Sequence, residues 1–247
     1  MSDERVVLVT HGLSKEFRRG IHHRSLFRML RWQMARPQNG GPRRSLDSIE
    51  IELRAGETVG LVGQNGAGKT TLLKTMAGLY APTVGTVECN GEVALLAGLG
   101  AGMVDELSVS DNIYLYGAVC RIPRTTIRRR FHDMLAWADL TRYEVAELRT
   151  LSTGMRTRLA FAIAMHIDSD VLLMDEAFSA GDKRFQAKCD EYFHERKSTG
   201  RTILVATHNL EFVRDFCERT LWLHQGKQMG FGSTEEVLPK YIEFCSK

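Results

Sequence analysis

The sequence lacks long apolar runs, a leader-like start and a regular cysteine pattern. No stretch approaches the roughly 20 uninterrupted apolar residues that a membrane-spanning helix needs. The first residues, Met1–Val9, include acids and lead directly into a β-branched run, so we expect no signal peptide. The five cysteines are odd in number and show no metal-ligand spacing, which predicts reduced thiols in a cytosolic protein. Any membrane role would therefore need a partner that supplies the membrane part.

Acidic residues are absent from residues 18–44, which hold eight arginines, although the net charge of the whole chain is only +3. The remainder of the chain is therefore net acidic. Apolar residues recur in this segment at helical spacing until Pro37; they are Leu26, Phe27, Leu30 and Met34. We interpret residues 18–44 as a basic insertion with a short amphipathic helix, between strands expected at Val6–Thr10 and Ile49–Leu53.

The rest of the chain alternates strand patterns with helix patterns. With 43% hydrophobic and 26% charged residues, the 247-residue chain has the composition of a soluble globular protein that buries a full core. Short apolar runs predict buried strands at Thr58–Val62, Val171–Met174 and Thr202–Ala206. The block at about 105–165 is mainly helical. We therefore expect one α/β domain over residues 1–247, with a doubly wound sheet and an inserted helical lobe.

The strongest chemical signal is a glycine-rich turn between the strand at Thr58–Val62 and the next helix. The run Gly63-Gln64-Asn65-Gly66-Ala67-Gly68-Lys69-Thr70 matches G-x-x-x-x-G-K-[ST]. In such a loop, backbone N–H groups surround a phosphate and the helix N-terminus adds its dipole. We expect Lys69 to reach the β- and γ-phosphates, Thr70 to hold Mg²⁺, and Thr71 to belong to the same ATP-binding set. Alone, the pattern predicts only that a nucleoside triphosphate binds.

The second signal is a pair of acids at the end of the strand Val171–Met174. The strand delivers Asp175 to the phosphate side of the sheet, where its carboxylate can hold Mg²⁺. Glu176 is then placed to polarise a water in line with the γ-phosphate as a general base. Two adjacent acids indicate hydrolysis rather than transfer to another substrate.

The third signal is Leu151-Ser152-Thr153-Gly154-Met155, which opens a helical run upstream of Asp175. It resembles the LSGGQ signature of ABC ATPases, with Ser152 and Gly154 kept. The resemblance implies a P-loop fold with a RecA-like sheet, an N-terminal antiparallel β region and a helical lobe. It also implies that Ser152, Thr153 and Gly154 contact the γ-phosphate bound to a second copy.

Three further motifs follow the order of that family. Ser179-Ala180-Gly181-Asp182 resembles the D-loop, with Asp182 as another contact across the dimer. His208 resembles the switch histidine that touches the γ-phosphate. Leu13-Ser14-Lys15-Glu16-Phe17 resembles the A-loop, which makes Phe17 the ring under adenine. The resemblance covers nearly the whole chain.

Departures from the common pattern indicate a branch of the family. The signature ends in Met155, and Leu99 in a glycine-rich connector stands where the Q-loop glutamine is expected. With the basic insertion, Asp111–Leu115 and Phe185–Cys189, these features resemble the polysaccharide-export subfamily. That subfamily exports lipid-linked O-antigen, capsule, teichoic acid or related envelope glycans. The chain ends soon after Leu238, so we expect no C-terminal carbohydrate-binding domain.

The resemblance implies ATP and Mg²⁺ as cofactors and a homodimer that docks on a multi-spanning permease. The location would be the cytoplasmic face of the inner membrane, with no nucleic acid as a partner. Residues 18–44, with Trp32, could lie against the anionic leaflet, meet the diphosphate of a lipid-linked substrate, or form a solvated surface helix.

Other ABC ATPases remain as alternatives. Soluble remodelling proteins usually carry two cassettes in one chain, and this chain has one. Chromosome and DNA-repair ATPases insert long heptad coiled coils, and none is found between Gly78 and Leu151. An importer ATPase is expected to keep the Q-loop glutamine.

Overall fold

A computed structural model describes residues 5–17, 43–175 and 183–246. The described strands form one nine-stranded sheet in the order β4-β1-β2-β9-β8-β3-β7-β6-β5. The strands are β1 (Val6–Phe17), β2 (Arg43–Arg54), β3 (Thr58–Val62), β4 (Val84–Cys89), β5 (Val93–Ala97), β6 (Val171–Asp175), β7 (Thr202–Ala206), β8 (Arg219–His224) and β9 (Lys227–Ser233). The helices are α2 (Lys69–Met76), α3 (Val109–Val119), α4 (Arg124–Trp137), α5 (Thr153–Ala164), α6 (Lys183–Ser198), α7 (Leu210–Phe216) and α8 (Thr234–Cys245), with 3₁₀ turns η1 (Thr141–Tyr143) and η2 (Leu148–Thr150).

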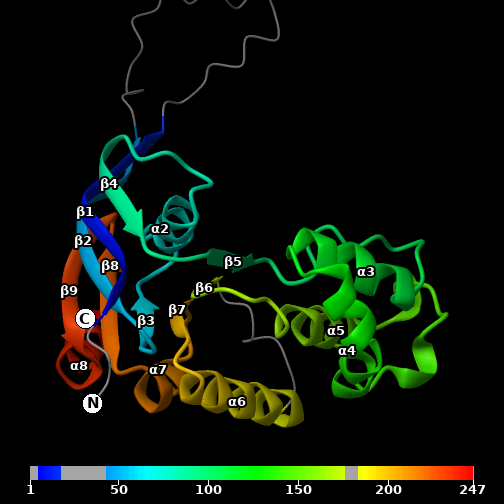
Figure 1. Ribbon diagram of the computed structural model, residues 1–247. Helices are drawn as coiled ribbons and strands as arrows, with labels where there is room; N and C mark the ends of the chain where they lie inside the picture. Colours follow the sequence, from blue (N-terminus) through cyan, green and yellow to red (C-terminus); the bar gives the residue numbers. More distant parts are fainter. Residues whose placement is uncertain (1–4, 18–42, 176–182, 247) are drawn as a thin grey trace, which may run out of the picture.

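The strands β8, β3, β7, β6 and β5 run parallel, and the central ones are buried on both faces. Because side chains alternate along a strand, one face of β6 sends Leu172 and Met174 into the core shared with the lobe, α6, α7 and α8. The other face sends Val171 and Leu173 into a second core with α2, β1 and β2. The predicted α/β class and doubly wound sheet are confirmed (Figure 1).

The N-terminal region is antiparallel, with β1 between β2 and β4. β1 continues to Phe17, which pairs with Arg43, so Arg43 and Arg44 lie in β2 rather than in the predicted insertion 18–44. The register shifts several times along β1, mostly after Thr10, which removes the simple alternation that sequence analysis needs to recognise a strand. The remaining residues of the predicted insertion, 18–42, lie outside the described residues.

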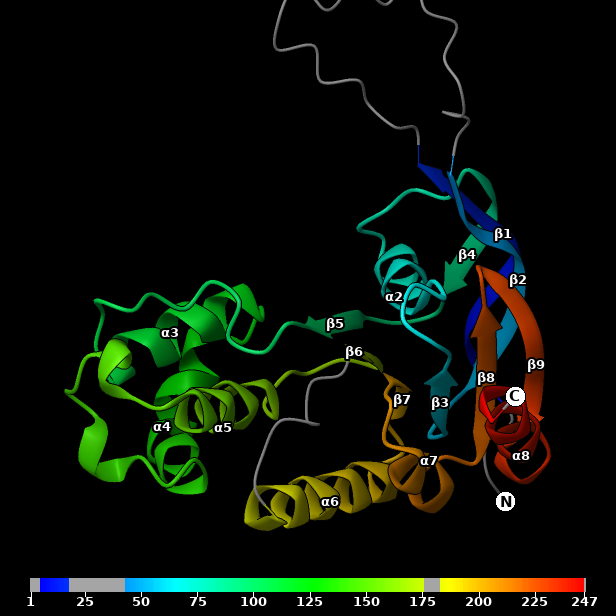
Figure 2. The same cartoon turned by 180° about the vertical axis from the view of Figure 1, so that it is seen from behind.

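The helices α3, α4 and α5 form a lobe at the β5 end of the sheet, far from β9 and α8 in both views (Figures 1 and 2). Phe161 of α5 ties this lobe to the body. Its ring centroid lies 5.5 Å from that of Trp137 in α4 and 5.6 Å from those of Phe185 and Tyr192 in α6. Within the described ranges, no helix combines the length and apolar character needed to cross a bilayer.

The turn between β8 and β9 supports the glycine-rich turn between β3 and α2. The Gly226 N–H donates to the carbonyl of Ala67 over 2.9 Å, and the Gly226 carbonyl accepts from the Asp47 N–H over 2.8 Å. Gly226 has a φ of +80°, and a Cβ at this position would lie 2.7 Å from the carbonyl oxygen of Ser45. One glycine thus joins three chain segments that are distant in sequence.

Replacing Phe161 by alanine should destabilise the protein by about 3–5 kcal/mol, because it opens a cavity in the aromatic cluster between lobe and body. Urea unfolding followed by circular dichroism measures this loss. Val119→Ala, at a position 56% exposed on the same lobe, is the control and should change stability by less than about 0.5 kcal/mol. Equal losses in the two variants would contradict a structural role for the aromatic cluster.

Gly226→Ala should lower the melting temperature more than Gly78→Ala. Both glycines have positive φ, so alanine costs about 1–2 kcal/mol at either site. Only at Gly226 would the new Cβ also strike backbone, since no atom lies within 4 Å of a Cβ at Gly78. Differential scanning calorimetry of both variants checks the order, and a smaller shift for Gly226→Ala would contradict it.

Candidate functional site

A cavity of about 600 Å³ opens where β3 turns into α2. Most of the residues predicted to bind nucleotide or metal lie in its wall. They are Asn65, Gly66, Ala67, Gly68, Lys69, Thr70, Thr71 and Asp175. The segment before α2 and the end of β6 therefore meet in one place, although about a hundred residues separate them in the chain.

Lys69 lies at the start of α2 with its side chain largely buried, at 7% exposure. Its Nζ donates to the carbonyl oxygen of Gly63 over 2.7 Å and lies 3.3 Å from Nε2 of His208. The same His208 nitrogen lies 3.2 Å from Oδ1 of Asn65. A cation, an imidazole and an amide are thus gathered beside the N-terminus of a helix, which suits them to bind an anion.

The parallel register of three strands places Asp175 and His208 beside this turn. In the sheet, Asp175 of β6 pairs with Ala206 of β7, and Leu61 of β3 pairs with Ala206 from the other side. His208 follows β7 by two residues, so it emerges at the same edge. Two other predicted residues, Glu176 and Asp182, lie outside the described residues.

The oxygen atoms in the cavity wall suit a hard cation. The hydroxyl-bearing Thr70 and the carboxylate of Asp175 both line the cavity. No group of three or more His, Cys, Asp or Glu side chains gathers as a metal site in the part of the chain that the structure describes. A small donor set of this kind fits Mg²⁺, which takes few protein ligands and completes its shell with water and phosphate oxygens.

Four further residues line the cavity that sequence reasoning did not assign to the site, namely Arg44, Ser45, Gln225 and Gly226. The guanidinium of Arg44 is held by Oε1 of Glu16 at 3.0 Å and by Oδ1 of Asp47 at 2.7 Å. These two carboxylates raise the pKa of Arg44, which stays charged. Nothing local in the sequence indicates these wall residues, because β-sheet pairing and the β8–β9 turn bring them there.

Tyr241 of α8 contacts Gly63, the first residue of the glycine-rich turn. Burial raises the pKa of its hydroxyl to about 12, the neighbouring Cys245 thiol adds to the rise, and the Gly63 N–H opposes it. Its ring packs on Trp222 of β8 with the centroids 5.8 Å apart, and Trp222 is the sheet partner of Val62. The C-terminal helix therefore supports the segment that positions Lys69.

The predicted ring under adenine, Phe17, is placed at the end of β1. Its ring meets Tyr80 edge-on, with the centroids 5.4 Å apart, and Nζ of Lys15 lies 5.1 Å from its centroid. Phe17 is not among the described residues that line the cavity. Its contact with adenine stays a prediction.

The signature residues lie apart from the cavity of their own chain. Ser152 caps α5, where its Oγ accepts from the Met155 N–H over 3.3 Å. Ser152, Thr153 and Gly154 are exposed, and no atom lies within 4 Å of a Cβ built on Gly154. None of the three is among the described residues of the cavity wall. The start of α5 is therefore free to meet a ligand held by another molecule.

The connector that follows β5 takes an unusual backbone path. Gly98, Gly100 and Gly102 all have positive φ, between 73° and 93°. Leu99, at the expected Q-loop position, is half-buried and packs against the core that includes the lobe. Within the described residues of the cavity wall, no side chain from this connector takes the place of the glutamine.

Comparison with known proteins finds a matching family model and similar ATP-binding proteins of export systems. The family model described as ABC transporter matches residues 46–179. The chain is 38% identical over 212 residues to the teichoic acids export ATP-binding protein TagH of Bacillus anthracis, covering 86% of this chain and 38% of that protein. It is 33% identical over 252 residues to the O-antigen export system ATP-binding protein RfbB of Myxococcus xanthus, covering 100% of this chain and 58% of that protein. This chain therefore spans less than two thirds of the length of either relative.

Among solved structures, the dimeric post-hydrolysis state of the ATP-binding cassette MJ0796 bound to ADP and Pi superimposes with a TM-score of 0.72. The sequences are 20% identical, and the match covers 92% of this chain and 98% of that one, so it shows the shared fold. The family model spans more than half of this chain, from Leu46 beside the cavity wall past the strand that carries Asp175. The chain belongs to the ABC transporter family.

Proposed function

We propose that this chain is the ATP-hydrolysing subunit of an ABC exporter that moves a lipid-linked envelope glycan across the cytoplasmic membrane. The observation that supports nucleotide hydrolysis most directly is the meeting of Lys69, Thr70 and Asp175 in one cavity at a helix N-terminus. His208 lies within 3.3 Å of Lys69 Nζ, on the same site. The names of the relatives, teichoic acid and O-antigen export proteins, support the glycan class.

In this proposal, the side chain of Lys69 changes its hydrogen-bond acceptor when ATP binds. Its Nζ now donates to the Gly63 carbonyl, 2.7 Å away, and would turn to the β- and γ-phosphate oxygens. Thr70 and Asp175 would hold Mg²⁺, which when bound neutralises charge on the phosphates. The backbone N–H groups of Gly66, Gly68 and their neighbours would surround the β-phosphate.

Hydrolysis would then depend on groups at the end of β6 and β7. Glu176 follows Asp175 directly and would polarise the attacking water as general base. His208, positioned by Asn65 and Lys69, would contact the γ-phosphate. Loss of the γ-phosphate removes its contacts and lets the site reopen.

The complete site would need a second copy of the chain. Ser152, Thr153 and Gly154 are exposed at the start of α5, away from their own cavity, and would grip the γ-phosphate on the partner together with Asp182. ATP would add contacts across the interface that ADP does not make, so binding would close a head-to-tail dimer. The dimeric state of the structurally similar MJ0796 supports this arrangement.

The exporter would also need a membrane partner. We propose that the dimer docks on a multi-spanning permease at the cytoplasmic face of the inner membrane and that the permease carries the glycan. Residues 18–42, which remain of the predicted basic insertion, would approach the anionic leaflet or the diphosphate of the lipid-linked substrate. Phe17 and Arg43, the described residues on either side of this segment, pair in the sheet, and the adjacent Arg44 lines the cavity.

Lys69→Ala should weaken ATP binding by about 10- to 100-fold, because it removes a charged donor to the phosphates. Lys74→Ala is the matched control on the same helix. Its Nζ lies 5.7 Å from the ring of Tyr80, and it is not among the described residues of the cavity wall. Fluorescent ATP titration compares the two variants. Similar affinities in both would exclude Lys69 from phosphate binding.

Glu176→Gln should bind ATP normally but turn it over at least about 100-fold more slowly, because the general base is lost. The variant should accumulate as an ATP-bound dimer. Light scattering after size exclusion, with ATP and with ADP, measures the association. A variant that stays monomeric with ATP, or hydrolyses it at the parent rate, would contradict the proposed mechanism.

Glycan export is tested by purification from the source cell. Tagged Glu176→Gln, solubilised from membranes with ATP present, should retain a multi-spanning permease and a polyprenyl-linked glycan. Mass spectrometry identifies both. Recovery of ribosomes, DNA-repair factors or a substrate-binding-protein importer would leave the ATPase assignment intact and overturn the export assignment.

A further inference from the structure

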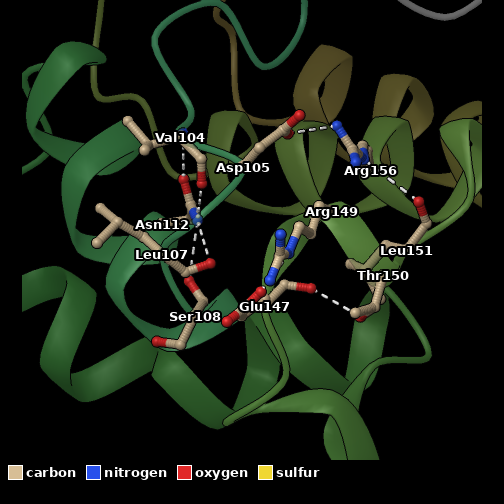
Figure 3. A network of polar contacts seen from close by, with 10 residues as sticks. All are labelled: Val104, Asp105, Leu107, Ser108, Asn112, Glu147, Arg149, Thr150, Leu151 and Arg156. Carbon is tan, nitrogen blue, oxygen red and sulfur yellow. Dashed lines mark hydrogen bonds and ion pairs between the residues drawn. The ribbon is translucent and has the colours of Figure 1, made fainter.

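The end of the glycine connector, Val104–Ser108, is fixed to the lobe by one buried amide. Asn112 of α3 is fully buried, and both ends of its side-chain amide are hydrogen-bonded. Its Oδ1 accepts from the Val104 N–H over 2.8 Å, and its Nδ2 lies within donating distance of the carbonyls of Val104, Leu107 and Ser108 at 2.9, 3.2 and 2.9 Å. Figure 3 shows these bonds converging on Asn112. This part of the connector therefore moves together with α3.

The same connector is tied to the segment that leads into the signature. The Leu148 N–H donates to the Leu107 carbonyl over 2.9 Å, and the Arg149 N–H donates to the Asp105 carbonyl over 3.0 Å. Both bonds join the connector to the 3₁₀ turn η2, which ends two residues before Ser152. They involve backbone atoms and do not depend on the side-chain types.

Arg156 adds a side-chain link between these two segments. Its Nη1 donates to Oδ1 of Asp105 over 2.5 Å, and its Nε donates to the carbonyl of Leu151 over 3.3 Å. Leu151 directly precedes the signature serine, Ser152. In Figure 3 the guanidinium lies between the connector and Leu151. A single planar group therefore holds an acid from the connector and the carbonyl next to Ser152.

This link adds little to folding stability. The side chains of Arg156 and Asp105 are 33% and 53% exposed, and ion pairs so open to water contribute little net free energy. The link matters for the position of Ser152, because it connects Asp105 to the carbonyl of the residue that precedes Ser152. Upstream, the positive-φ glycines 98, 100 and 102 lie between this unit and β5. The rigid unit starts at Val104, beyond those glycines.

We propose that Arg156 and Asp105 are positioning residues that fix the signature serine to the connector, so that a displacement of the connector moves Ser152 relative to the ATP of a second copy. The proposal rests on the proposed function, in which Ser152 completes the partner's site. Arg156 acts through Leu151 and Ser152 and not on the phosphate bound in its own chain, since it is not among the described residues of that cavity wall.

The test uses the full chain with Glu176→Gln, in which ATP-driven dimers accumulate. Adding Asp105→Asn or Arg156→Gln should weaken ATP-dependent dimerisation by about 10-fold, a size typical of coupling between neighbouring groups. Affinity of the monomer for fluorescent ATP should stay within about 2-fold and the melting temperature within about 2 °C. Asp133→Asn is the matched control, because Asp133 forms an exposed ion pair with Arg130 on the same lobe, 3.1 Å long, that does not reach the signature.

Conservative variants separate the two contacts of Arg156. Asp105→Glu keeps the charge and should dimerise like the parent. Arg156→Lys keeps the ion pair but cannot also donate to the Leu151 carbonyl. Its affinity for ATP-dependent dimerisation should therefore lie between those of the parent and of Arg156→Gln. Hydrogen exchange should show amides of both Val104–Ser108 and Leu148–Met155 opening faster in Arg156→Gln, which a purely local effect at one segment would not produce.

The outcomes distinguish this proposal from the function on which it rests. If the Glu176→Gln parent dimerises with ATP and both charge-removing variants dimerise equally well, the positioning role is wrong and the proposed function stands. The positioning role is also wrong if Asp133→Asn weakens dimerisation as much as Asp105→Asn. If the parent itself does not dimerise with ATP, the proposed function fails and the positioning role fails with it.

Discussion

The site depends on the parallel register of β3, β7 and β6. Each strand is apolar on both faces, so each must lie inside the sheet with helices on either side. Parallel strands end at the same edge, and the residues that follow them are therefore brought together. The glycine-rich turn after Val62, the carboxylate of Asp175 and the imidazole of His208 meet for this reason, although they come from distant parts of the chain.

Sequence patterns are enough to indicate which residues meet at this edge of the sheet, because local residue types determine them. A buried parallel strand needs a short apolar run, and a phosphate-binding turn needs glycines before Lys69. Both patterns can be recognised in the sequence without knowing which distant segments they contact. The remaining residues of the cavity wall could not be predicted from the sequence. Arg44 reaches the cavity through its place in β2, and Gly226 reaches it through a hairpin turn that bonds to Ala67. These positions depend on pairing between distant segments, which a single sequence does not reveal.

The missed elements have a similar explanation. β4 is largely exposed and shows no apolar alternation, and β1 loses its alternation at the register shifts beyond Thr10. α6 has a strongly polar surface and meets the lobe through a few aromatic residues such as Phe185 and Tyr192. For Phe17 the motif gives the residue type, but the side-chain direction follows from contacts with Tyr80 and Lys15, and Tyr80 lies outside the motif.

In the proposed function, the ATPase site is divided between the cavity of one copy and the exposed start of α5 in another, which would control when ATP is hydrolysed. Ser152 does not line the cavity of its own chain among the described residues, so in the proposed function it would act only on ATP held by a second copy. In the proposed function, the exposed start of α5 would make hydrolysis depend on a second copy, and its link to the connector would make hydrolysis depend on what the connector touches. Coupling between two sites typically amounts to only about 1–3 kcal/mol of free energy. An exposed ion pair such as Asp105–Arg156 would suit that task, because it contributes little to folding stability itself.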